Sequence, residues 1–305
     1  RYDFNTPNFY LKFAQGKLLY ELGYVDFDSF FNHYKTQNRW LKEQVLNLNY
    51  AEKKVLFKYL QTNATPENKK YNYDFFYDNC ATKMRDVLIE LLGDKLEYKE
   101  GHITEAYTFR ELIQKNVKAN SWGSLGMDVA IGAVVDRKAK PIQYQFLPEY
   151  VLEGANNAVI TRNNEEVPLV KNYNYLFEAH KQELQNNFFL SPFFVFGCLG
   201  ICLIFITYKD FKNETRSRIT DLLIFLITGI VGMILLLLWI ATDHSATVTN
   251  YNLLWAFPFS ILFILQIFKK APRTWLRKYI FFLMMLLVLL LIHWTTGQFN
   301  IQMQY

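Results

Sequence analysis

Residues 71–92 read YNYDFFYDNCATKMRDVLIELL, which joins an aromatic run, a polar turn and an amphipathic segment. Apolar residues recur at helical spacing after the turn and a glycine follows them, so the pattern predicts a helix over 80–92. Asp78 and Asn79 stand just before this helix, where side chains that cap a helix are found. Cys80 is therefore expected in the first turn of the helix.

Cys80 is the only cysteine in residues 1–187, and a lone thiol is either buried and inert or kept for reactivity. The free N–H groups and the dipole of a helix N-terminus favour a thiolate, so we favour a nucleophile over a structural thiol. Cys198 and Cys202 lie in an apolar run, where a packing role is expected.

A thiol nucleophile needs a base, and residues 1–187 offer three histidines. His102 follows a glycine in a predicted loop and is a weak fallback for the base. His33 and His180 are expected at the surface, and a solvent-exposed position is the alternative for His102 as well.

Four apolar stretches follow residue 187 and predict a transmembrane domain over 188–305. The first two have the ~20 residues that cross ~30 Å of hydrocarbon, and the others can extend into uncharged flanks. Gly229 and Gly232 are expected to allow close helix packing. The predicted helices cover about 188–208, 222–241, 253–268 and 279–294.

The net charge of +5 comes entirely from residues 209–305, because residues 1–187 hold equal numbers of basic and acidic side chains. This balance argues against nucleic-acid binding. The segments 209–221 and 269–278 hold nine Lys and Arg residues, whereas 242–252 and 295–305 hold none. Positive loops stay in the cytoplasm, so residues 1–187 and the C-terminus are predicted on the outer side.

Residues 1–187 mix helical and strand patterns and predict an α+β domain. Besides 80–92, helices are expected over 6–15, 28–34, 49–60 and 108–118, and strands over 17–27 and 36–48.

The cysteine motif, which extends from Tyr71-Asn72-Tyr73 through Asp78-Asn79-Cys80 to Asp86, resembles that of the Lnb lipoprotein N-acyltransferase family of Bacteroidota. Further likeness lies in Phe109-Arg110, Trp122, Gly126-Met127-Asp128, Gly132, Asp136 and Phe146-Leu147-Pro148. In the apolar half it lies in Thr242-Asp243-His244, Asn250, Asn252-Leu253-Leu254-Trp255-Ala256 and Pro258. The likeness extends over nearly the whole chain, and the cysteine motif is its most specific part.

The resemblance implies that residues 1–187 are an exported, periplasmic catalytic domain with a circularly permuted papain-like (NlpC-like) fold. It also implies a catalytic histidine in a Gly-His segment upstream of Arg1, so we expect the domain to be truncated at its N-terminus. Side chains in the matching motifs are expected to support the nucleophile: Asp78, Asn79, Arg85, Arg110 and Asp136.

The resemblance further implies an acyltransferase of the bacterial inner membrane. An acyl chain would pass from a phospholipid to Cys80 as a thioester, and then to the N-terminal amine of a diacylated lipoprotein. The segment 242–252 is predicted outside, against the exported domain or a lipid head. His244, Asn250 and Asn252 are the expected residues on the lipid side.

Two other classes of function remain open from the sequence. A membrane-anchored papain-like cysteine peptidase or amidase acting on cell-wall or periplasmic peptides would use the same Cys80, with a hydrophilic cleft. A non-catalytic membrane scaffold would not need the thiol. No cofactor is expected, and no metal site, because no cluster of residues has ligand spacing.

Overall fold

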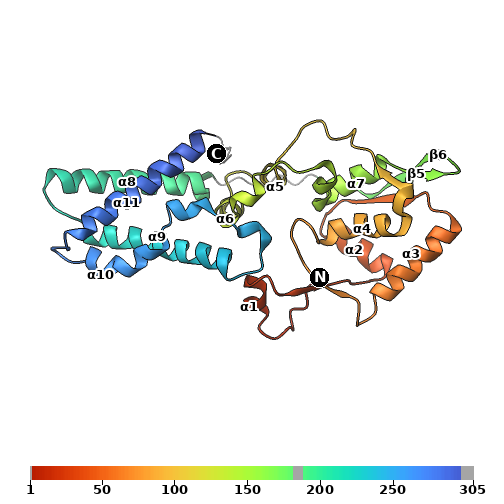
Figure 1. Cartoon of the computed structure of the whole chain (residues 1–305), viewed down its shortest axis with the longest axis horizontal. Helices are drawn as coiled ribbons and strands as arrows, with labels where there is room; N and C mark the ends of the chain where they lie inside the picture. The colour runs from red at the N-terminus through yellow and green to blue at the C-terminus, as the bar shows by residue number, and fades with distance from the viewer. Residues whose placement is uncertain (1, 181–187, 297–305) are drawn as a thin grey trace. The chain divides into compact units, whose positions relative to one another are not determined.

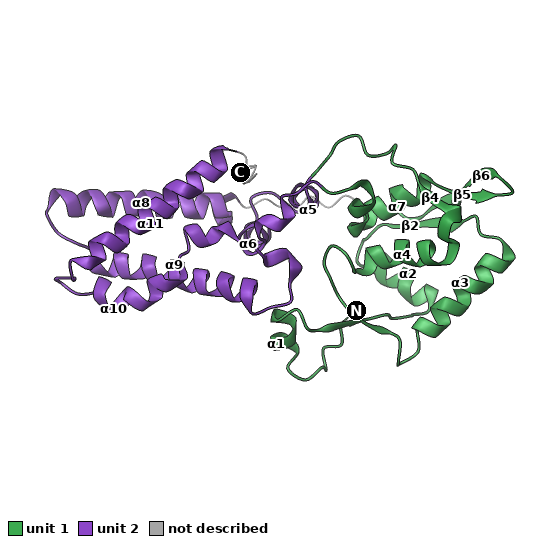
Figure 2. Ribbon diagram, viewed as in Figure 1, with its two compact units in different colours: residues 1–107, 139–184 green, residues 108–138, 185–305 purple. Residues whose placement is uncertain are grey.

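The computed structural model describes residues 2–180 and 188–296. The chain forms two compact units, one of residues 1–107 and 139–184 and the other of residues 108–138 and 185–305 (Figure 2). Residues 108–138, which the sequence analysis placed in the exported half, thus belong with the apolar helices. The mixture of helices and strands confirms the α+β class, and the papain-like topology stays a prediction.

Unit 1 holds most of the strands and the helix that begins at Cys80 (Figure 1). Its elements are α1 (Phe9–Ala14), β1 (Leu19–Glu21), α2 (Phe27–Thr36), β2 (Leu41–Leu46), α3 (Tyr50–Asn63), β3 (Lys70–Asn72), α4 (Cys80–Leu92), η1 (Gly93–Lys95), β4 (Leu96–Tyr98), η3 (Pro141–Phe146), α7 (Pro148–Asn156), β5 (Ala158–Arg162), β6 (Glu165–Pro168) and β7 (Val170–Phe177).

The strands of unit 1 form three small antiparallel sheets, β1–β3, β2–β7 and β4–β5–β6. A core of buried apolar residues lies between the larger sheets and the C-terminal half of α4, and it includes Leu48, Leu92, Ala158, Ile160 and Leu169. Burial of these side chains fixes α4 from its far end. In its first turn Ala81 and Thr82 are buried as well, and Cys80 is exposed.

The helix predicted over 80–92 is confirmed at both ends, because α4 runs from Cys80 to Leu92. The strand predicted over 36–48 is present as the shorter β2, and the helix predicted over 108–118 as the shorter α5 (Phe109–Gln114). Met84 is one of the apolar residues at helical spacing in 80–92, but 64% of it is exposed.

Unit 2 consists almost entirely of helices. They are α5, α6 (Trp122–Ala130), η2 (Ala133–Val135), η4 (Phe188–Leu190), α8 (Pro192–Lys212), α9 (Arg218–Ile240), η5 (Ser245–Thr247), η6 (Tyr251–Leu254), η7 (Pro258–Phe263), α10 (Ile264–Ile267) and α11 (Trp275–Thr295).

Three described helices, α8, α9 and α11, are long and apolar enough to cross a membrane, and they match three of the four predicted stretches. The fourth stretch is not one long helix. It is divided among the short helices η6, η7 and α10. Pro258 stands at the start of η7, and a proline interrupts an α-helix because it has no N–H to donate.

The divided stretch nevertheless packs along α9. A Cβ on Gly232 would overlap the carbonyl oxygen of Ala256, and a Cβ on Gly229 would lie 2.9 Å from the backbone nitrogen of Ile261. The expectation that these two glycines allow close packing is confirmed.

The first basic segment contacts the two residues that precede the second, at one end of unit 2. Arg216 donates to the carbonyl oxygen of Ile267 at 2.7 Å, and Arg218 donates to that of Phe268 at 3.4 Å. Much of the divided stretch is 3₁₀ helix, in η6 and η7. A 3₁₀ helix rises by about 2.0 Å per residue against about 1.5 Å in an α-helix, so the divided stretch covers more distance than an α-helix with the same number of residues. The contacts agree with the predicted common side of both loops, and a fourth membrane crossing stays a prediction.

Candidate functional site

Cys80 is the first residue of α4, and its thiol is exposed. Asn79 caps the helix. Its side-chain oxygen accepts hydrogen bonds from the backbone N–H groups of Ala81 at 2.8 Å and Thr82 at 2.9 Å. In return, the backbone N–H of Asn79 donates to the Thr82 hydroxyl at 2.8 Å. This capping box fixes the backbone on both sides of the thiol.

The turn before Cys80 is also held by its own side chains. The Asp74 carboxylate accepts from the backbone N–H groups of Phe76 at 2.8 Å and Tyr77 at 2.9 Å. The amide of buried Asn79 donates to the carbonyl oxygens of Phe75 at 2.8 Å and Phe146 at 2.9 Å. Because these bonds tie the turn to η3, the thiol is presented from a rigid support.

Two of the predicted supporting residues lie in this region without touching the thiol. Asp78 forms an ion pair with Lys83 at 2.7 Å. Arg85 pairs with Asp86 at 2.6 Å and donates to the carbonyl oxygen of Ile142 at 3.0 Å. Both therefore brace the first turns of α4 through neighbouring residues.

Tyrosines gather on one face of the two-stranded β1–β3 sheet. Tyr20 and Tyr71 are directly paired across the two strands, and Tyr73 follows two residues after Tyr71, so their side chains leave the same face. Ring centroids of Tyr20 lie 5.7 Å from those of Tyr71 and 5.0 Å from those of Tyr73. Tyr2 adds an edge contact to Tyr20 at 4.8 Å. We call Tyr20, Tyr71 and Tyr73 the tyrosine cluster.

The tyrosine cluster lies within electrostatic reach of Cys80. Burial raises the pKa of Tyr71 and Tyr73 well above the ordinary value, and the negative charge of the Cys80 thiolate raises both further. The pKa of Tyr20 is raised by the same two causes. All three phenols are consequently neutral around Cys80 at physiological pH.

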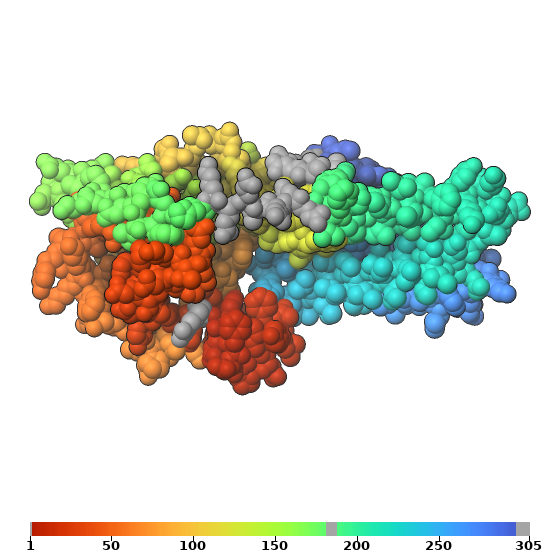
Figure 3. All heavy atoms as spheres, turned by 180° about the vertical axis from the view of Figure 1, so that it is seen from behind, coloured from red at the N-terminus to blue at the C-terminus, as the bar shows by residue number. Residues whose placement is uncertain are grey.

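Apolar side chains flank the thiol at the surface. Met84 lies one turn after Cys80 on the same face of α4, and Phe75 and Tyr77 in the preceding turn are exposed by 45% and 44%. The N-terminal residues form a projecting lobe of unit 1, red in Figure 3, with Tyr10 on α1 largely exposed. The exposed surface near the thiol therefore includes apolar and aromatic side chains beside the Asp78–Lys83 ion pair.

The histidines of unit 1 provide no established partner for the thiol. Within residues 2–180 and 188–296, no hydrogen bond joins Cys80 to a histidine, and His102 has a buried Nδ1 without a hydrogen-bond partner. The backbone of His180 pairs with the side chain of Asn38, and His33 is exposed on α2. His102 as a base therefore stays a prediction.

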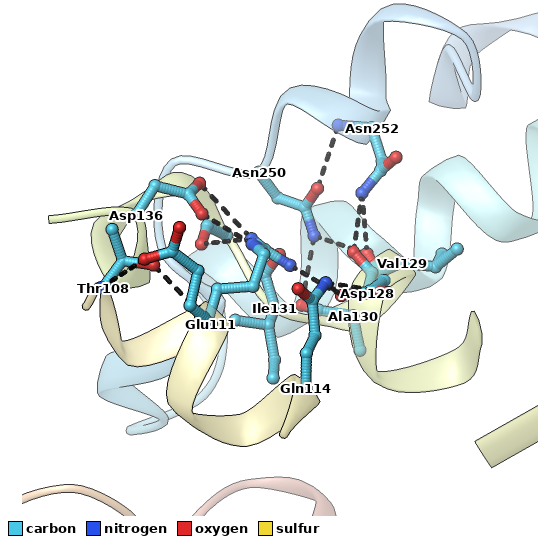
Figure 4. A network of polar contacts seen from close by, with 12 residues as sticks. Thr108, Glu111, Gln114, Asp128, Val129, Ala130, Ile131, Asp136, Asn250 and Asn252 are labelled. Atoms are coloured by element: carbon cyan, nitrogen blue, oxygen red, sulfur yellow. Dashed lines mark hydrogen bonds and ion pairs between the residues drawn. The ribbon is translucent and has the colours of Figure 1, made fainter. Parts of the chain in front are cut away.

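Arg110 and Asp136 lie in unit 2 and form a separate buried cluster, which we call the arginine cluster (Figure 4). Arg110 is 2% exposed and donates to Asp136 at 2.6 Å and to Asp128 at 3.2 Å. It also donates to the carbonyl oxygens of Ile131 and Gly132. Burial raises the pKa of Asp136, and the Arg110 guanidinium opposes that rise. These contacts indicate a structural role for the pair.

Asn250 and Asn252 join the segment 242–252 to α6. The Asn250 amide donates to the carbonyl oxygens of Val129 at 2.8 Å and Ala130 at 3.1 Å, and Asn252 donates to those of Asp128 and Val129. Both asparagines are buried, so these contacts favour anchoring over lipid binding, which stays a prediction. The 242–252 segment thus contacts residues 128–133, which belong to unit 2, and its predicted place against the exported domain stays a prediction.

The same joint depends on two backbone pairs. Gly132 donates to the carbonyl oxygen of Ala246 at 2.9 Å, and Ala133 donates to that of Thr249 at 2.9 Å. A Cβ on Gly132 would overlap the carbonyl oxygen of Val248, so only glycine fits there. His244, partly buried, lies in this segment, and its predicted role on the lipid side is untested.

Two family models match the chain. The Lnb N-terminal periplasmic domain matches residues 1–115, and the Lnb transmembrane domain matches residues 183–304. The chain belongs to the Lnb family. No curated protein and no solved structure matches it.

Membership in the Lnb family confirms the resemblance drawn from the motifs and supports a membrane protein with an N-terminal periplasmic domain. Within the described part of this Lnb chain, no three His, Cys, Asp or Glu side chains are grouped so as to hold a metal ion. The tyrosine cluster is the feature that sequence reasoning missed. The spacing of Tyr71 and Tyr73 was its signal, but the pairing with Tyr20 depends on a distant strand.

Proposed function

We propose that this protein is a lipoprotein N-acyltransferase and that Cys80 is its nucleophile. The proposal rests on one observation above all, an exposed thiol held at the N-terminus of α4 in a chain of the Lnb family. Family membership supports the type of enzyme, and the three apolar helices support a site of action at a membrane.

The reaction that fits this arrangement has two balanced steps. In the first, the Cys80 sulfur attacks the ester carbonyl carbon of a phospholipid, and the thiol proton ends on the released lysophospholipid alcohol. In the second, the N-terminal amine of a diacylated lipoprotein attacks the thioester, an amide forms, and the thiol is regenerated. Cys80 is the first residue of α4, so its sulfur is positioned by the capped turn for the first step.

The surface around Cys80 favours an acyl substrate over a peptide. Exposed Phe75, Tyr77 and Met84 surround the motif, and a water-exposed apolar surface is costly unless it has a partner. The periplasmic peptidase or amidase considered from the sequence calls for a polar cleft at the thiol, whereas three of the exposed side chains near Cys80 are apolar or aromatic, beside the Asp78–Lys83 ion pair.

The test is the N-terminal state of lipoproteins in cells that depend on this protein. Mass spectrometry should find triacylated N-terminal peptides with the wild type and diacylated ones with Cys80→Ala. Cys198→Ala and Cys202→Ala are matched controls, because they remove exposed thiols from α8, and both should keep the triacylated form.

Triacylated peptides at wild-type level with Cys80→Ala would refute the proposed nucleophile. Diacylated lipoproteins with every variant, together with cleavage of periplasmic peptides that needs Cys80, would favour the peptidase. Unchanged lipoproteins and no Cys80-dependent product would indicate a scaffold.

We also propose four membrane crossings, with unit 1 and the C-terminus in the periplasm. Nine Lys and Arg residues lie in the two segments 209–221 and 269–278, whose flanking residues meet at one end of unit 2. A reporter that is active only in the periplasm should work when fused to the C-terminus. Activity of a reporter that functions only in the cytoplasm would contradict the fourth crossing.

A further inference from the structure

We propose that hydroxyl groups of the tyrosine cluster donate hydrogen bonds to the oxyanion that forms when Cys80 attacks a carbonyl carbon. The inference rests on the proposed function, since it needs Cys80 as the nucleophile. It adds catalytic residues that the cysteine motif alone does not supply.

The first support is the geometry of the β1–β3 sheet. Direct pairing of Tyr20 with Tyr71 and the alternation of side chains along β3 place Tyr20, Tyr71 and Tyr73 on one face. The ring distances of 5.0 and 5.7 Å from Tyr20 hold the three together. Edge-on and tilted aromatic contacts of this kind restrict ring motion, and pre-organised donors stabilise an oxyanion most effectively.

The second support is the position of this face beside the first turn of α4. The Lys83 ammonium lies 4.6 Å from the Tyr71 ring centroid, and Lys83 is one turn after Cys80 on the same side of the helix. Lys83 is held there by Asp78, just before the capping residue. Through Lys83, the ring of Tyr71 is linked to α4 after Cys80 and to Asp78 before it.

The third support is that these hydroxyls are not used by the protein. Across the described ranges, no hydrogen bond involves the hydroxyl of Tyr20, Tyr71 or Tyr73. Tyr144 shows the contrast, because its buried hydroxyl accepts from the backbone N–H of Tyr107 at 2.6 Å and donates to the carbonyl oxygen of Glu105 at 2.9 Å. Half-buried phenols without protein partners are available to a ligand.

The charge state of the cluster decides which role the phenols can take. Burial and the neighbouring Cys80 thiolate hold the pKa of Tyr71 and Tyr73 far above neutral pH. A phenol in this state keeps its proton, so it donates a hydrogen bond and does not act as a base. The same neutral state avoids repulsion with the thiolate.

The step assisted by the tyrosine cluster is the formation of the tetrahedral intermediate. The sulfur–carbon bond forms while the carbonyl π electrons move onto oxygen, and the phenol O–H groups stabilise that negative charge. Collapse restores the C=O bond and breaks the bond to the leaving alkoxide, which takes up the proton that the thiol lost. The phenols finish the step unchanged.

The experiment compares two reactions of the same thiol in the full-length protein carrying Cys198→Ala and Cys202→Ala. Acylation by p-nitrophenyl butyrate passes through an oxyanion, whereas alkylation by iodoacetamide is a displacement at a saturated carbon and has none. Tyr20→Phe, Tyr71→Phe and Tyr73→Phe are tested, and Tyr50→Phe on α3, which is 83% exposed, is the control. Phenylalanine keeps the ring contacts, and circular dichroism checks the fold.

We expect at least one of the cluster variants to lower the acylation rate by about tenfold or more, as removal of an oxyanion donor does, while alkylation is unchanged. Tyr50→Phe should alter neither reaction. An equal loss in both reactions would overturn the inference, because the phenols would then act on the thiol itself. Unchanged acylation in all three variants would overturn it as well.

The outcomes also separate this inference from the proposed function. Loss of Cys80 acylation in the phenylalanine variants together with no transfer to a diacylated lipopeptide by the wild type would reject the acceptor and keep the tyrosine donors. Full acylation in the phenylalanine variants together with normal transfer by the wild type would reject the tyrosine donors and keep the lipoprotein acceptor. Acylation that persists in Cys80→Ala would reject both.

Discussion

The motif residues of this chain divide into two kinds of region, the turn at Cys80 in unit 1 and the arginine cluster in unit 2. The thiol at Cys80 is exposed, and the neighbouring phenol hydroxyls have no protein partner within the described ranges. Arg110 is 2% exposed and its guanidinium is occupied by two carboxylates and two carbonyl oxygens. Both regions carry family motifs, yet only the first leaves reactive groups available.

A motif residue whose polar atoms are all hydrogen-bonded to other protein atoms serves a different purpose from one whose reactive group has no protein partner. Arg110 binds atoms within residues 108–138, and Asn250 and Asn252 fix that segment to the part of the chain that follows α9. At the cysteine motif, Asn79 uses its side chain to hold a backbone turn, and the thiol next to it is free to react. Anchoring and chemistry therefore respond to mutation in different ways.

The largest expected effect is the loss of the arginine cluster. Arg110→Met leaves the Asp128 and Asp136 carboxylates buried without their counter-ion, which costs about 3–5 kcal/mol of unfolding free energy. Arg137→Met is the matched control because Arg137 is exposed and lies 5.2 Å from the Phe109 ring centroid, and it should lower stability by no more than about 1 kcal/mol. Thermal unfolding in detergent measures both, and equal midpoints would contradict the anchoring role.

Next in size is a methyl group placed in the joint between η2 and the segment 242–252. Gly132→Ala should destabilise unit 2 by about 1–3 kcal/mol, because the new Cβ would overlap the Val248 carbonyl oxygen. Gly126→Ala on α6 meets open space, so it should be neutral or slightly stabilising. Protection of the 242–252 segment from hydrogen exchange should fall only with Gly132→Ala.

Two capping asparagines sharpen the comparison between stability and chemistry. Asn79→Ala and Asn49→Ala each remove a capping box, at about 1–2 kcal/mol of unfolding free energy. Only Asn79 holds the turn at Cys80, so the acylation rate per folded molecule should fall with Asn79→Ala alone. A similar loss of rate with Asn49→Ala, on α3, would mean that general destabilisation causes it.

The smallest expected effect concerns the apolar surface beside the thiol. Met84→Ser should slow acylation by phospholipid vesicles by a few-fold, since one exposed apolar side chain contributes on the order of 1 kcal/mol to binding, and should leave acylation by a water-soluble ester unchanged. Ile89→Ser is the control, because Ile89 is exposed on the opposite side of α4. Equal slowing by both variants would argue against a lipid-facing surface at Cys80.

Local features of the sequence predicted the local structure well. The ends of α4 follow from a capping residue, a helical apolar period and Gly93, all of which act within one or two turns. The apolar lengths predicted α8, α9 and α11, which match for the same reason.

Contacts between residues far apart in the chain could not be predicted from the sequence. Asn250 and Asn252 looked like lipid-facing polar residues, but their partners are carbonyl groups some 120 positions earlier in the chain. Tyr20 joins Tyr71 only because β1 pairs with β3. The apolar stretch 253–268 is divided into short helices, since Pro258 and close contact with α9 override a pattern that favours one helix.

The most direct test of the central claim is detection of the acyl group on Cys80. The full-length protein is mixed with phospholipid, quenched in acid and digested, and the peptide that contains Cys80 is analysed by mass spectrometry. The account predicts an acyl adduct on Cys80 that hydroxylamine removes and that disappears when a diacylated lipopeptide is added. Formation of triacylated lipopeptide by Cys80→Ala at the wild-type rate would contradict it.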